Sequence, residues 1–548
     1  MPVETDQSGK RGHAPTFDAI IIGAGLAGMQ QLHLLRGLGL SVRVYEASDD
    51  VGGTWNISRY PGLRLDSESH TYAYAFDDEI LQEWNWTERF VGQAELSRYF
   101  RHVADKLDLR RDIVFDTRVE RASFDEARDL WVVDTSDGAR AEARFLISCI
   151  GALVAAPQMP RIAGIESFAG EAYHTNAWPR DREVSFAGKR VAVIGTGATG
   201  VQIVQEVSKT AGHLTVFQRT PNWCAPLGNG PISQAEMDKI KANYKDIFAR
   251  CKATYAQFDH QIDFRSALEV SEEEREALFE QRYNEPGFSI FLGVFIDCLF
   301  DPRANALLSD FAARKIRQRV HDPKTAEVLI PKDHGFGSRR LPLETNYYEA
   351  YNRDNVSLID CRATPIEEIT PGGIRTSECE HPFDMIIYAT GFDAVVGPLA
   401  RIDLRGIGGR ALKDKWADGP VSWMGMHTNG FPNLLIVGGP NSSATLCNVP
   451  RCIEDMVGWT TQLIAHTQTS GHRRFEVTEA AEQGWTDAVL TAAEQTLAGH
   501  VDSWFTGVNS NIDGRQKRRF LLYPAGAVAY REELEASAAH TYPQLTFA

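Results

Sequence analysis

Residues 17–48 read FDAIIIGAGLAGMQQLHLLRGLGLSVRVYEAS, and this stretch decides the fold. An apolar β-branched run leads into Gly23-x-Gly25-x-x-Gly28, an apolar helical stretch follows, and a second strand ends at Glu46. In a dinucleotide-binding βαβ unit, the first glycine makes the tight turn, the second lets the backbone approach a pyrophosphate, and the third lets helix pack on strand. The helix amino terminus holds the phosphates, and an acid at the end of the second strand accepts bonds from ribose hydroxyls. The stretch therefore predicts a parallel sheet with a dinucleotide site.

A second stretch of the same kind occupies residues 189–223, KRVAVIGTGATGVQIVQEVSKTAGHLTVFQRTPNW. No carboxylate stands at its ribose position, where the sequence is Arg219-Thr220. An acid there would repel a 2′-phosphate, whereas an arginine pairs with it. The first unit therefore suits FAD and the second suits NADPH, although an arginine that only ends a strand remains an alternative. The candidate residues of the second site are Gly195, Thr196, Gly197, Thr199, Gly200, Arg219 and Thr220.

Length and composition limit the class of protein. At 548 residues the chain is too long for one hydrophobic core, so we expect several domains. The formal charge of -16 argues against a general nucleic-acid partner, because nucleic acids bind basic surfaces. The most apolar run, residues 288–300, is shorter than the roughly 20 residues of a membrane span.

Two further features bear on the compartment. The polar first residues lack the apolar core of a signal peptide. The eight cysteines are scattered and form no CxxC pair, so we expect reduced, buried thiols. Together these features predict a cytoplasmic protein.

Between the two glycine turns lies FAGEAYHTNAWP, residues 168–179, whose imidazole and indole are unusual for a connector. It fulfils the pattern F-x-G-x-x-x-H-T-x-x-W-P, and residues 53–66 fulfil G-x-W-x-x-x-x-Y-P-G-x-x-x-D. With the two flanking fingerprints, these motifs resemble the signatures of type I Baeyer–Villiger monooxygenases. The resemblance extends from about residue 17 to near residue 514, which is nearly the whole chain.

The resemblance implies an enzyme that uses FAD, NADPH and O2. In this family NADPH reduces FAD, and the reduced flavin takes up O2 as a C4a-peroxide that attacks a ketone. The adduct rearranges to an ester or lactone. Negative charge sits first on the peroxide and then on the former carbonyl oxygen, so a fixed cation beside this path stabilises both. The expected partners are a ketone and O2, without nucleic acid, metal or membrane span, and the expected state is a monomer or weak homo-oligomer.

The resemblance also implies roles for individual residues. Arg340 matches the active-site arginine, and Asp66 matches the carboxylate that pairs with it near the flavin. Arg339 stands where relatives usually carry a lysine for the 2′-phosphate, a contact that arginine can make bidentately. His174 matches a hinge residue that couples cofactor position to domain movement, and Trp504 matches a tryptophan that holds the nicotinamide nucleotide. From the sequence alone, Arg339 and Arg340 could instead form a solvated turn, and Trp504 could instead be packed in the core.

The remaining site candidates lie beside the flavin and in a late loop. Trp55 and Tyr72 complete the expected flavin contacts. The loop at residues 439–449, GPNSSATLCNV, matches a family region that varies with substrate. Its candidates for the substrate pocket are Leu446, Cys447 and Val449, although a surface loop packed on the flavin domain is an equal alternative.

The predicted fold is α/β, with two Rossmann-like dinucleotide-binding domains and a helical insert. We expect a discontinuous FAD domain at residues 15–153 and 385–548, and an NADPH domain at 154–225 and 331–384. Charged helix formers with amphipathic spacing at 226–330 predict the insert.

Three other functions remain open. A flavin monooxygenase that hydroxylates nitrogen or sulfur shares the glycine turns but usually lacks Thr175 and the Trp178-Pro179 ending. A disulfide reductase needs a CxxC near the flavin, and the sequence has none. A regulator that binds NADPH or flavin without turnover does not need both Arg340 and Asp66.

Overall fold

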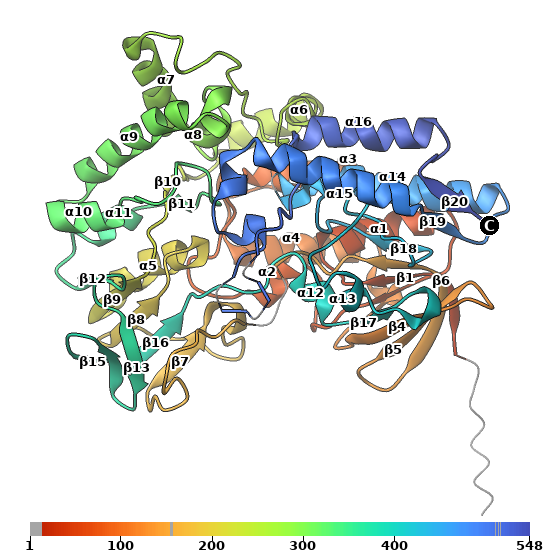
Figure 1. Ribbon diagram of the computed structural model, residues 1–548, viewed down its shortest axis with the longest axis horizontal. Coiled ribbons are helices and arrows are strands. Elements are labelled where there is room, and N and C mark those ends of the chain that lie inside the picture. Colours follow the sequence, from red (N-terminus) through yellow and green to blue (C-terminus); the bar gives the residue numbers. More distant parts are fainter. Residues whose placement is uncertain (1–13, 154–156, 446, 510, 513, 516) are drawn as a thin grey trace, which may run out of the picture.

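The computed structural model describes residues 14–153, 157–445, 447–509, 511–512, 514–515 and 517–548. Two lobes stand side by side, each built on its own sheet (Figure 1). The right-hand lobe contains β1, β4–β6, β17 and β18, and the left-hand lobe contains β7–β9, β12 and β16. The α/β class with two Rossmann-like units is confirmed.

The first lobe is built on an eight-stranded sheet of order β17-β4-β5-β6-β1-β2-β3, with β18 beside β6. β1 (Thr16–Ile22), α1 (Leu26–Gly37) and β2 (Val42–Tyr45) form the predicted first unit, in which β1 and β2 are parallel. Because β17 and β18 come from the last third of the chain, the first lobe is discontinuous. The other strands are β3 (Ile113–Val114), β4 (Val119–Asp125), β5 (Leu130–Thr135), β6 (Arg140–Ser148), β17 (Asp403–Arg405) and β18 (Leu434–Ile436).

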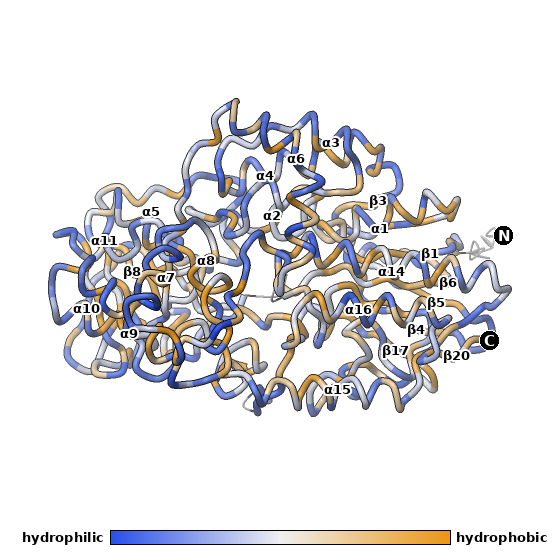
Figure 2. The backbone as a smooth tube through the Cα atoms, turned by 90° about the horizontal axis from the view of Figure 1, so that it is seen from above, coloured by the Kyte–Doolittle hydropathy of each residue, from blue (hydrophilic) through white to orange (hydrophobic). Residues whose placement is uncertain are grey.

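Helices cover this sheet and bury its central strand. α1 packs on α14 (Val449–Thr469), which packs in turn on α16 (Gly526–Ala539). Residues 19–22 of β1 are buried. An uninterrupted apolar run is expected for a parallel strand that is covered on both faces. Hydrophobic segments follow the inner strands of the lobe (Figure 2). The main remaining helices are α2 (Thr54–Ile57), α3 (Asp78–Glu83), α4 (Gln93–Lys106) and α15 (Glu479–Glu494).

The second lobe is built on a five-stranded parallel sheet of order β12-β9-β8-β16-β7. β8 (Arg190–Ile194), α5 (Ala198–Thr210) and β9 (His213–Gln218) form the predicted second unit. β12 (Val356–Asp360) lies outside β9, and β7 (Glu171–His174) is the opposite edge strand. Residues 171–174 of the expected connector are therefore a strand of this sheet, and the connector residues on either side of them lie outside the strand.

One expected domain boundary is wrong. β16 (Met385–Tyr388) was assigned to the FAD domain, but it pairs with β7 and β8 in the second sheet. The second lobe therefore extends to Tyr388. All four residues of the strand are buried, and a fully buried parallel strand has the same apolar pattern in either sheet, so the sequence could not assign it.

The predicted helical insert joins β10 (Ala225–Pro226) to β11 (Leu343–Glu344) and forms the upper left of Figure 1. Its helices are α6 (Gln234–Lys252), α7 (Glu272–Asn284), α8 (Ser289–Leu292), α9 (Pro302–Arg319) and α10 (Pro323–Leu329). Side chains of Ser233, Ser271, Asp301 and Asp322 cap four of them. Within the described part of the chain, no helix has both the length and the apolar character needed to cross a membrane.

Candidate active site

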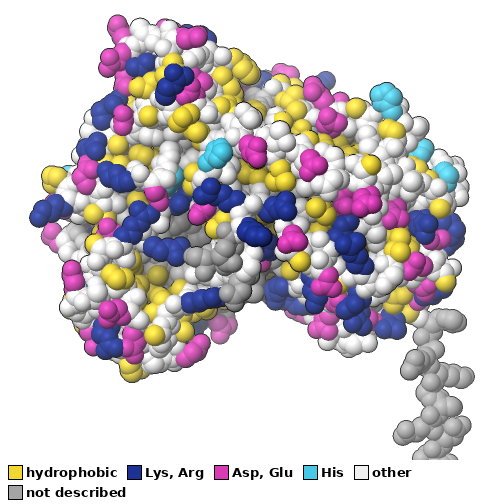
Figure 3. Space-filling model, in the orientation of Figure 1, with side chains coloured by type: hydrophobic (Ala, Val, Ile, Leu, Met, Phe, Trp, Pro, Cys, Tyr) yellow, Lys and Arg dark blue, Asp and Glu magenta, His cyan; other side chains and the backbone are white. Residues whose placement is uncertain are grey.

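A cleft of about 1730 Å³ separates the lobes and is lined by both glycine turns. Drug-sized ligands occupy roughly 300–1,000 Å³, so the cleft has room for more than one small molecule. The surface is hollowed between the lobes, and lysine and arginine side chains gather there (Figure 3). The cleft is therefore the place to test the predicted cofactor residues.

The first glycine turn has no room for a side chain at Gly23 or Gly28. Gly23 has φ +100°, and a Cβ there would lie 2.7 Å from the Cys149 carbonyl oxygen. A Cβ on Gly28 would collide with the carbonyl of Gly23, and one on Gly53 would lie 3.0 Å from the Cα of Gly25. These close backbone approaches leave the bare turn that a pyrophosphate requires at a helix amino terminus.

Glu46 lies at the end of β2, where the ribose position was predicted. Glu46 is 4% exposed, and its carboxylate accepts hydrogen bonds from the Ala24 amide at 2.7 Å, from the Ser48 amide at 2.8 Å and from the Ser48 hydroxyl at 2.7 Å. The acid is thus tied to the glycine turn. A carboxylate has about four acceptor positions, so a bond from a ribose hydroxyl fits beside these three.

The second glycine turn repeats the geometry of the first. Gly195 has φ +109°, and a Cβ there would lie 2.5 Å from the Ala389 carbonyl oxygen. A Cβ on Gly200 would collide with the carbonyl of Gly195, whereas Gly197 faces open space. The Thr196 hydroxyl donates to the Thr220 carbonyl at 3.0 Å and so joins this turn to the ribose position. Both turns thus fit a dinucleotide.

The ribose end of the second turn is strongly cationic. Arg219, Thr220 and Arg339 all line the cleft. Burial lowers the pKa of Arg339, Asp333 opposes this change, and Arg362 and Arg219 lower the pKa further. The structure therefore gathers the two predicted arginines at one end of the cleft, beside Asp333 and Arg362, two residues that the sequence did not predict.

Arg340 and Asp66 form an ion pair between the lobes, although they lie 274 residues apart. The Arg340 guanidinium also lies over the Phe288 ring, 4.8 Å from the ring centroid, and the Asn222 side-chain amide donates to the Arg340 carbonyl at 3.1 Å. The Arg340 side chain is 29% exposed and lines the cleft. A permanent cation is thus fixed between a carboxylate and an aromatic ring, with access to the cleft.

The segment before Asp66 rests on α5 of the other lobe. The Tyr60 hydroxyl donates to Gln202 Oε1 at 2.7 Å, and Gln202 Nε2 donates to the Arg64 carbonyl at 3.2 Å. Gly62 has φ +84°, and a Cβ there would lie 2.5 Å from the Gln202 carbonyl oxygen. Burial raises the pKa of Tyr60, so the phenol stays a neutral donor. Gln202 belongs to the site but was missed, because its position in the helix sequence carries no signal for this contact.

The two remaining flavin candidates contact each other. The Trp55 indole N–H donates to the Tyr72 hydroxyl at 3.0 Å, and the two rings meet edge to face with centroids 5.9 Å apart. Both residues line the cleft. They form a rigid aromatic corner next to the first glycine turn.

His174 lies where the chain crosses between the lobes. The Thr390 hydroxyl donates to the Gln158 carbonyl at 2.7 Å, so the two crossing segments are bonded to each other. The imidazole faces the backbone of Gln158 and of Gly391, and its Nδ1 accepts from the Asn176 amide at 3.1 Å. Burial lowers the pKa of His174, so the ring is neutral at pH 7. This histidine therefore contacts both crossings.

The rest of the motif is divided between core and cleft. Trp178 is buried, with ring centroids 5.2 Å from Tyr173 and 6.3 Å from Phe186, and it packs inside the second lobe. Thr175 is also buried and lines the cleft. Trp504, in a short 3-10 helix, lines the cleft as well.

The late loop is described only in part. Leu446 lies outside the described residues, and Cys447 and Val449 line the cleft. Cys447 forms a disulfide with Cys452, so the expectation of reduced thiols throughout the chain is wrong. The start of α14 brings the two Cα atoms to 6.6 Å, although the pair is not a CxxC motif. The expectation of burial also fails at Cys379, which is exposed.

Comparison with known proteins relates the chain to flavin-dependent oxygenases. The family model described as Flavin-binding monooxygenase-like matches residues 18–226. The 2-oxo-Δ3-4,5,5-trimethylcyclopentenylacetyl-CoA monooxygenase of Pseudomonas putida is 46% identical over 97% of this chain and 98% of its own. A Baeyer–Villiger monooxygenase of Pseudooceanicola batsensis and a phenazine N-monooxygenase of Lysobacter antibioticus are each 41% identical, over 96% of either chain.

The structural comparison covers the whole molecule. A crystal structure of OTEMO in complex with FAD and NADP matches with a TM-score of 0.94 and 45% identity. The match covers 98% of this chain and 100% of the other. Both lobes and the cleft between them therefore have counterparts in a protein crystallised with the two predicted cofactors.

Proposed function

Because the chain belongs to the Baeyer–Villiger monooxygenases, we propose that its cleft oxidises a ketone beside the Arg340–Asp66 pair. The protein is an NADPH- and O2-dependent flavin enzyme that converts a ketone to an ester or lactone. The assignment of roles to its residues rests on the geometry of the cleft.

The observation that carries the proposal is the position of Arg340. Its guanidinium is held by Asp66 and Phe288 in the cleft that both glycine turns line, and a flavin and a nicotinamide bound at these turns would share that cleft. Ketone oxidation develops negative charge on oxygen, and an arginine stabilises it without giving up a proton. One such donor typically contributes about 3–4 kcal/mol to lowering the barrier. Asp66 sets the direction of the guanidinium and keeps the cation compensated when no substrate is present.

We assign FAD to the first lobe and NADPH to the second. The turn at Gly23, the carboxylate of Glu46 and the Trp55–Tyr72 corner would hold FAD, and the turn at Gly195 with Arg219, Thr220 and Arg339 would hold NADPH. When bound, the pair supplies hydride and activates O2. Trp504 lines the same cleft and would keep the nicotinamide nucleotide in place, which excludes water from the reacting oxygen.

His174 is the proposed link between cofactor binding and lobe movement. Its imidazole faces both crossing segments, so a change in the angle between the lobes alters the surroundings of this ring. Cys447 and Val449 are proposed to line the ketone pocket. The cytoplasmic location and the monomeric or weakly oligomeric state stay predictions.

Oxidation of a ring nitrogen is the second candidate activity. The phenazine N-monooxygenase is as similar to this chain as the named Baeyer–Villiger enzyme, so identity at this level does not separate the two reactions. An N-oxidation uses the activated oxygen as an electrophile and needs no cation beside a carbonyl. The fixed Arg340 therefore favours the ketone.

Product analysis tests the proposal. The FAD-loaded enzyme is incubated with NADPH, ¹⁸O2 and ketones of graded bulk, with phenazine as the competing substrate. We expect an ester or lactone that carries one ¹⁸O atom at the ring or ester oxygen, and no phenazine oxide. N-oxide formation without any ester would contradict the proposal.

A further inference from the structure

The carboxyl-terminal edge of the second sheet carries an arginine outside both fingerprints. β12 pairs in parallel with β9, with Asp360 opposite Gln218. Two residues past the ends of both strands, Arg362 lies beside Thr220, and its Nη2 donates to the Thr220 hydroxyl at 3.3 Å. The ribose of a bound dinucleotide lies at the end of the second strand of the unit. Arg362 therefore reaches the ribose position from the neighbouring strand.

The Asp333 carboxylate holds this arginine in place. Asp333 Oδ2 lies 2.6 Å from Nη2 of Arg362 and 3.8 Å from Nη2 of Arg339, while Oδ1 lies 2.7 Å from His334 Nδ1. Burial acts to raise the pKa of Asp333, but His334 and Arg362 outweigh it and lower the pKa to about 2. Asp333 is thus ionised at pH 7 and keeps two guanidinium groups close together despite their repulsion.

We infer that Arg362 is a specificity-determining residue that binds the 2′-phosphate of NADPH together with Arg219 and Arg339, an inference that rests on the proposed coenzyme. Three guanidinium charges face two carboxylates, those of Asp333 and of Asp360, which accepts a hydrogen bond from the Arg362 amide at 2.9 Å, so the cluster keeps a net charge of +1. A phosphate monoester carries about −1.5 to −2 at pH 7, so its charge is opposite to that of the cluster. The other carboxylate near Arg339, Asp502, is paired with Arg518 at 2.6 Å.

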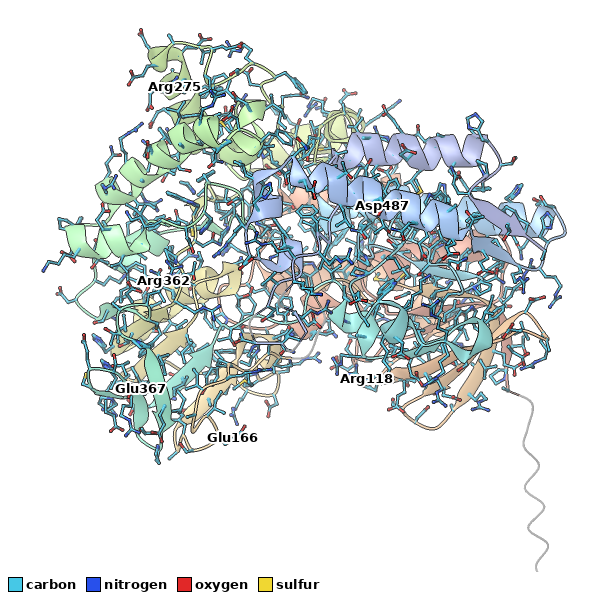
Figure 4. All side chains as sticks on the ribbon, in the orientation of Figure 1. Arg118, Glu166, Arg275, Arg362, Glu367 and Asp487 are labelled. Atoms are coloured by element: carbon cyan, nitrogen blue, oxygen red, sulfur yellow. A yellow bond between two sulfur atoms is a disulfide. The ribbon has the colours of Figure 1, made fainter. Side chains whose placement is uncertain are left out.

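Arg362 is a half-exposed arginine that is distinguished by its contacts with Thr220 and Asp333. Figure 4 shows it on the left-hand lobe above Glu367, which belongs to the small sheet that starts at β13 (Ile366–Thr370). The Arg362 side chain is 46% exposed, and the adjacent Cys361 lines the cleft. A planar guanidinium already bonded to Thr220 needs little rearrangement to bind a phosphate bidentately.

The test compares NADPH with NADH in the FAD-loaded enzyme. A hydrogen bond to a charged group is worth about 1.5–3 kcal/mol, so Arg362→Ala should lower kcat/KM for NADPH about 10- to 150-fold. NADH has no 2′-phosphate, so its kcat/KM should not change. Arg362→Lys keeps the positive charge but loses the planar guanidinium, so its kcat/KM for NADPH should lie between that of the wild type and that of Arg362→Ala.

Arg190→Ala is the matched control. Arg190 is 49% exposed, pairs with Asp384 at 2.6 Å and lies in the same sheet, but at the amino-terminal end of β8. Arg190→Ala should leave kcat/KM for NADPH and for NADH unchanged. An unchanged NADPH to NADH ratio in Arg362→Ala, or an equal loss for both coenzymes, would overturn the inference while the proposed function stands. A wild-type enzyme without preference for NADPH would overturn both.

Discussion

Replacement of Gly62 by alanine tests whether the signature segment must lie directly on α5. Gly62 has φ +84°, and an added Cβ would lie 2.5 Å from the Gln202 carbonyl oxygen. A side chain in the left-handed region costs about 1–2 kcal/mol. Overpacking against a fixed backbone adds about 1–3 kcal/mol. The expected loss of stability for Gly62→Ala is therefore about 2–5 kcal/mol.

Gly138 provides the matched control, because it has φ +81° and nothing within 4 Å of its added Cβ. Gly138→Ala should cost only the backbone term of about 1–2 kcal/mol. The measurements are the thermal midpoint of the FAD-loaded enzyme, followed by flavin fluorescence, and kcat with a ketone. Gly62→Ala should also lower kcat, because any outward shift of its segment moves Asp66 relative to Arg340. Equal midpoints and equal kcat for the two variants would refute this reasoning.

Three other changes have defined outcomes. Arg219→Ala should lower kcat/KM for NADPH about 10- to 150-fold, because a hydrogen bond to a charged group is lost. NADH is the control coenzyme, and an equal fall in kcat/KM for both coenzymes would show that Arg219 does not bind the 2′-phosphate. His174→Ala should keep FAD bound, measured by absorbance, while kcat falls; unchanged steady-state kinetics would exclude a role in lobe movement. Burial lowers the pKa of His427 to about 3 from 6.5, so its stabilising contribution is complete above pH 6.5 and is lost as the pH falls toward 3. When the pH is lowered from 8 to 5, the free energy of unfolding should therefore fall by about 2 kcal/mol less in His427→Gln than in the wild type. Urea titrations at the two pH values measure this difference, and an equal fall in both proteins would contradict the prediction.

The parts of the fold that depend on local chemistry could be predicted from the sequence. Each glycine turn needs its residues within a few positions, and the turns at Gly23 and Gly195 lie where the pattern placed them. The insert was predicted because charged, amphipathic runs give helices wherever they pack. The strand at residues 385–388 was assigned to the wrong sheet, because burial alone does not identify the partner strands.

The site required contacts between distant parts of the chain. The pairing of Asp66 with Arg340 came from a family resemblance and not from spacing, since 274 residues separate them. Gln202 and Arg362 were missed because their roles depend on how α5 and β12 meet the rest of the molecule. The Cys447–Cys452 pair was missed because its spacing is that of no common motif.

The yield of ester per NADPH consumed in Arg340→Ala tests the central claim most directly. Arg64→Ala is the control, because Arg64 lines the same cleft, is also 29% exposed and pairs with Glu88 at 3.0 Å. The predicted result is that Arg340→Ala binds FAD and oxidises NADPH but forms hydrogen peroxide and no ester, whereas Arg64→Ala still forms ester. Ester formation by Arg340→Ala at the wild-type yield would contradict the account.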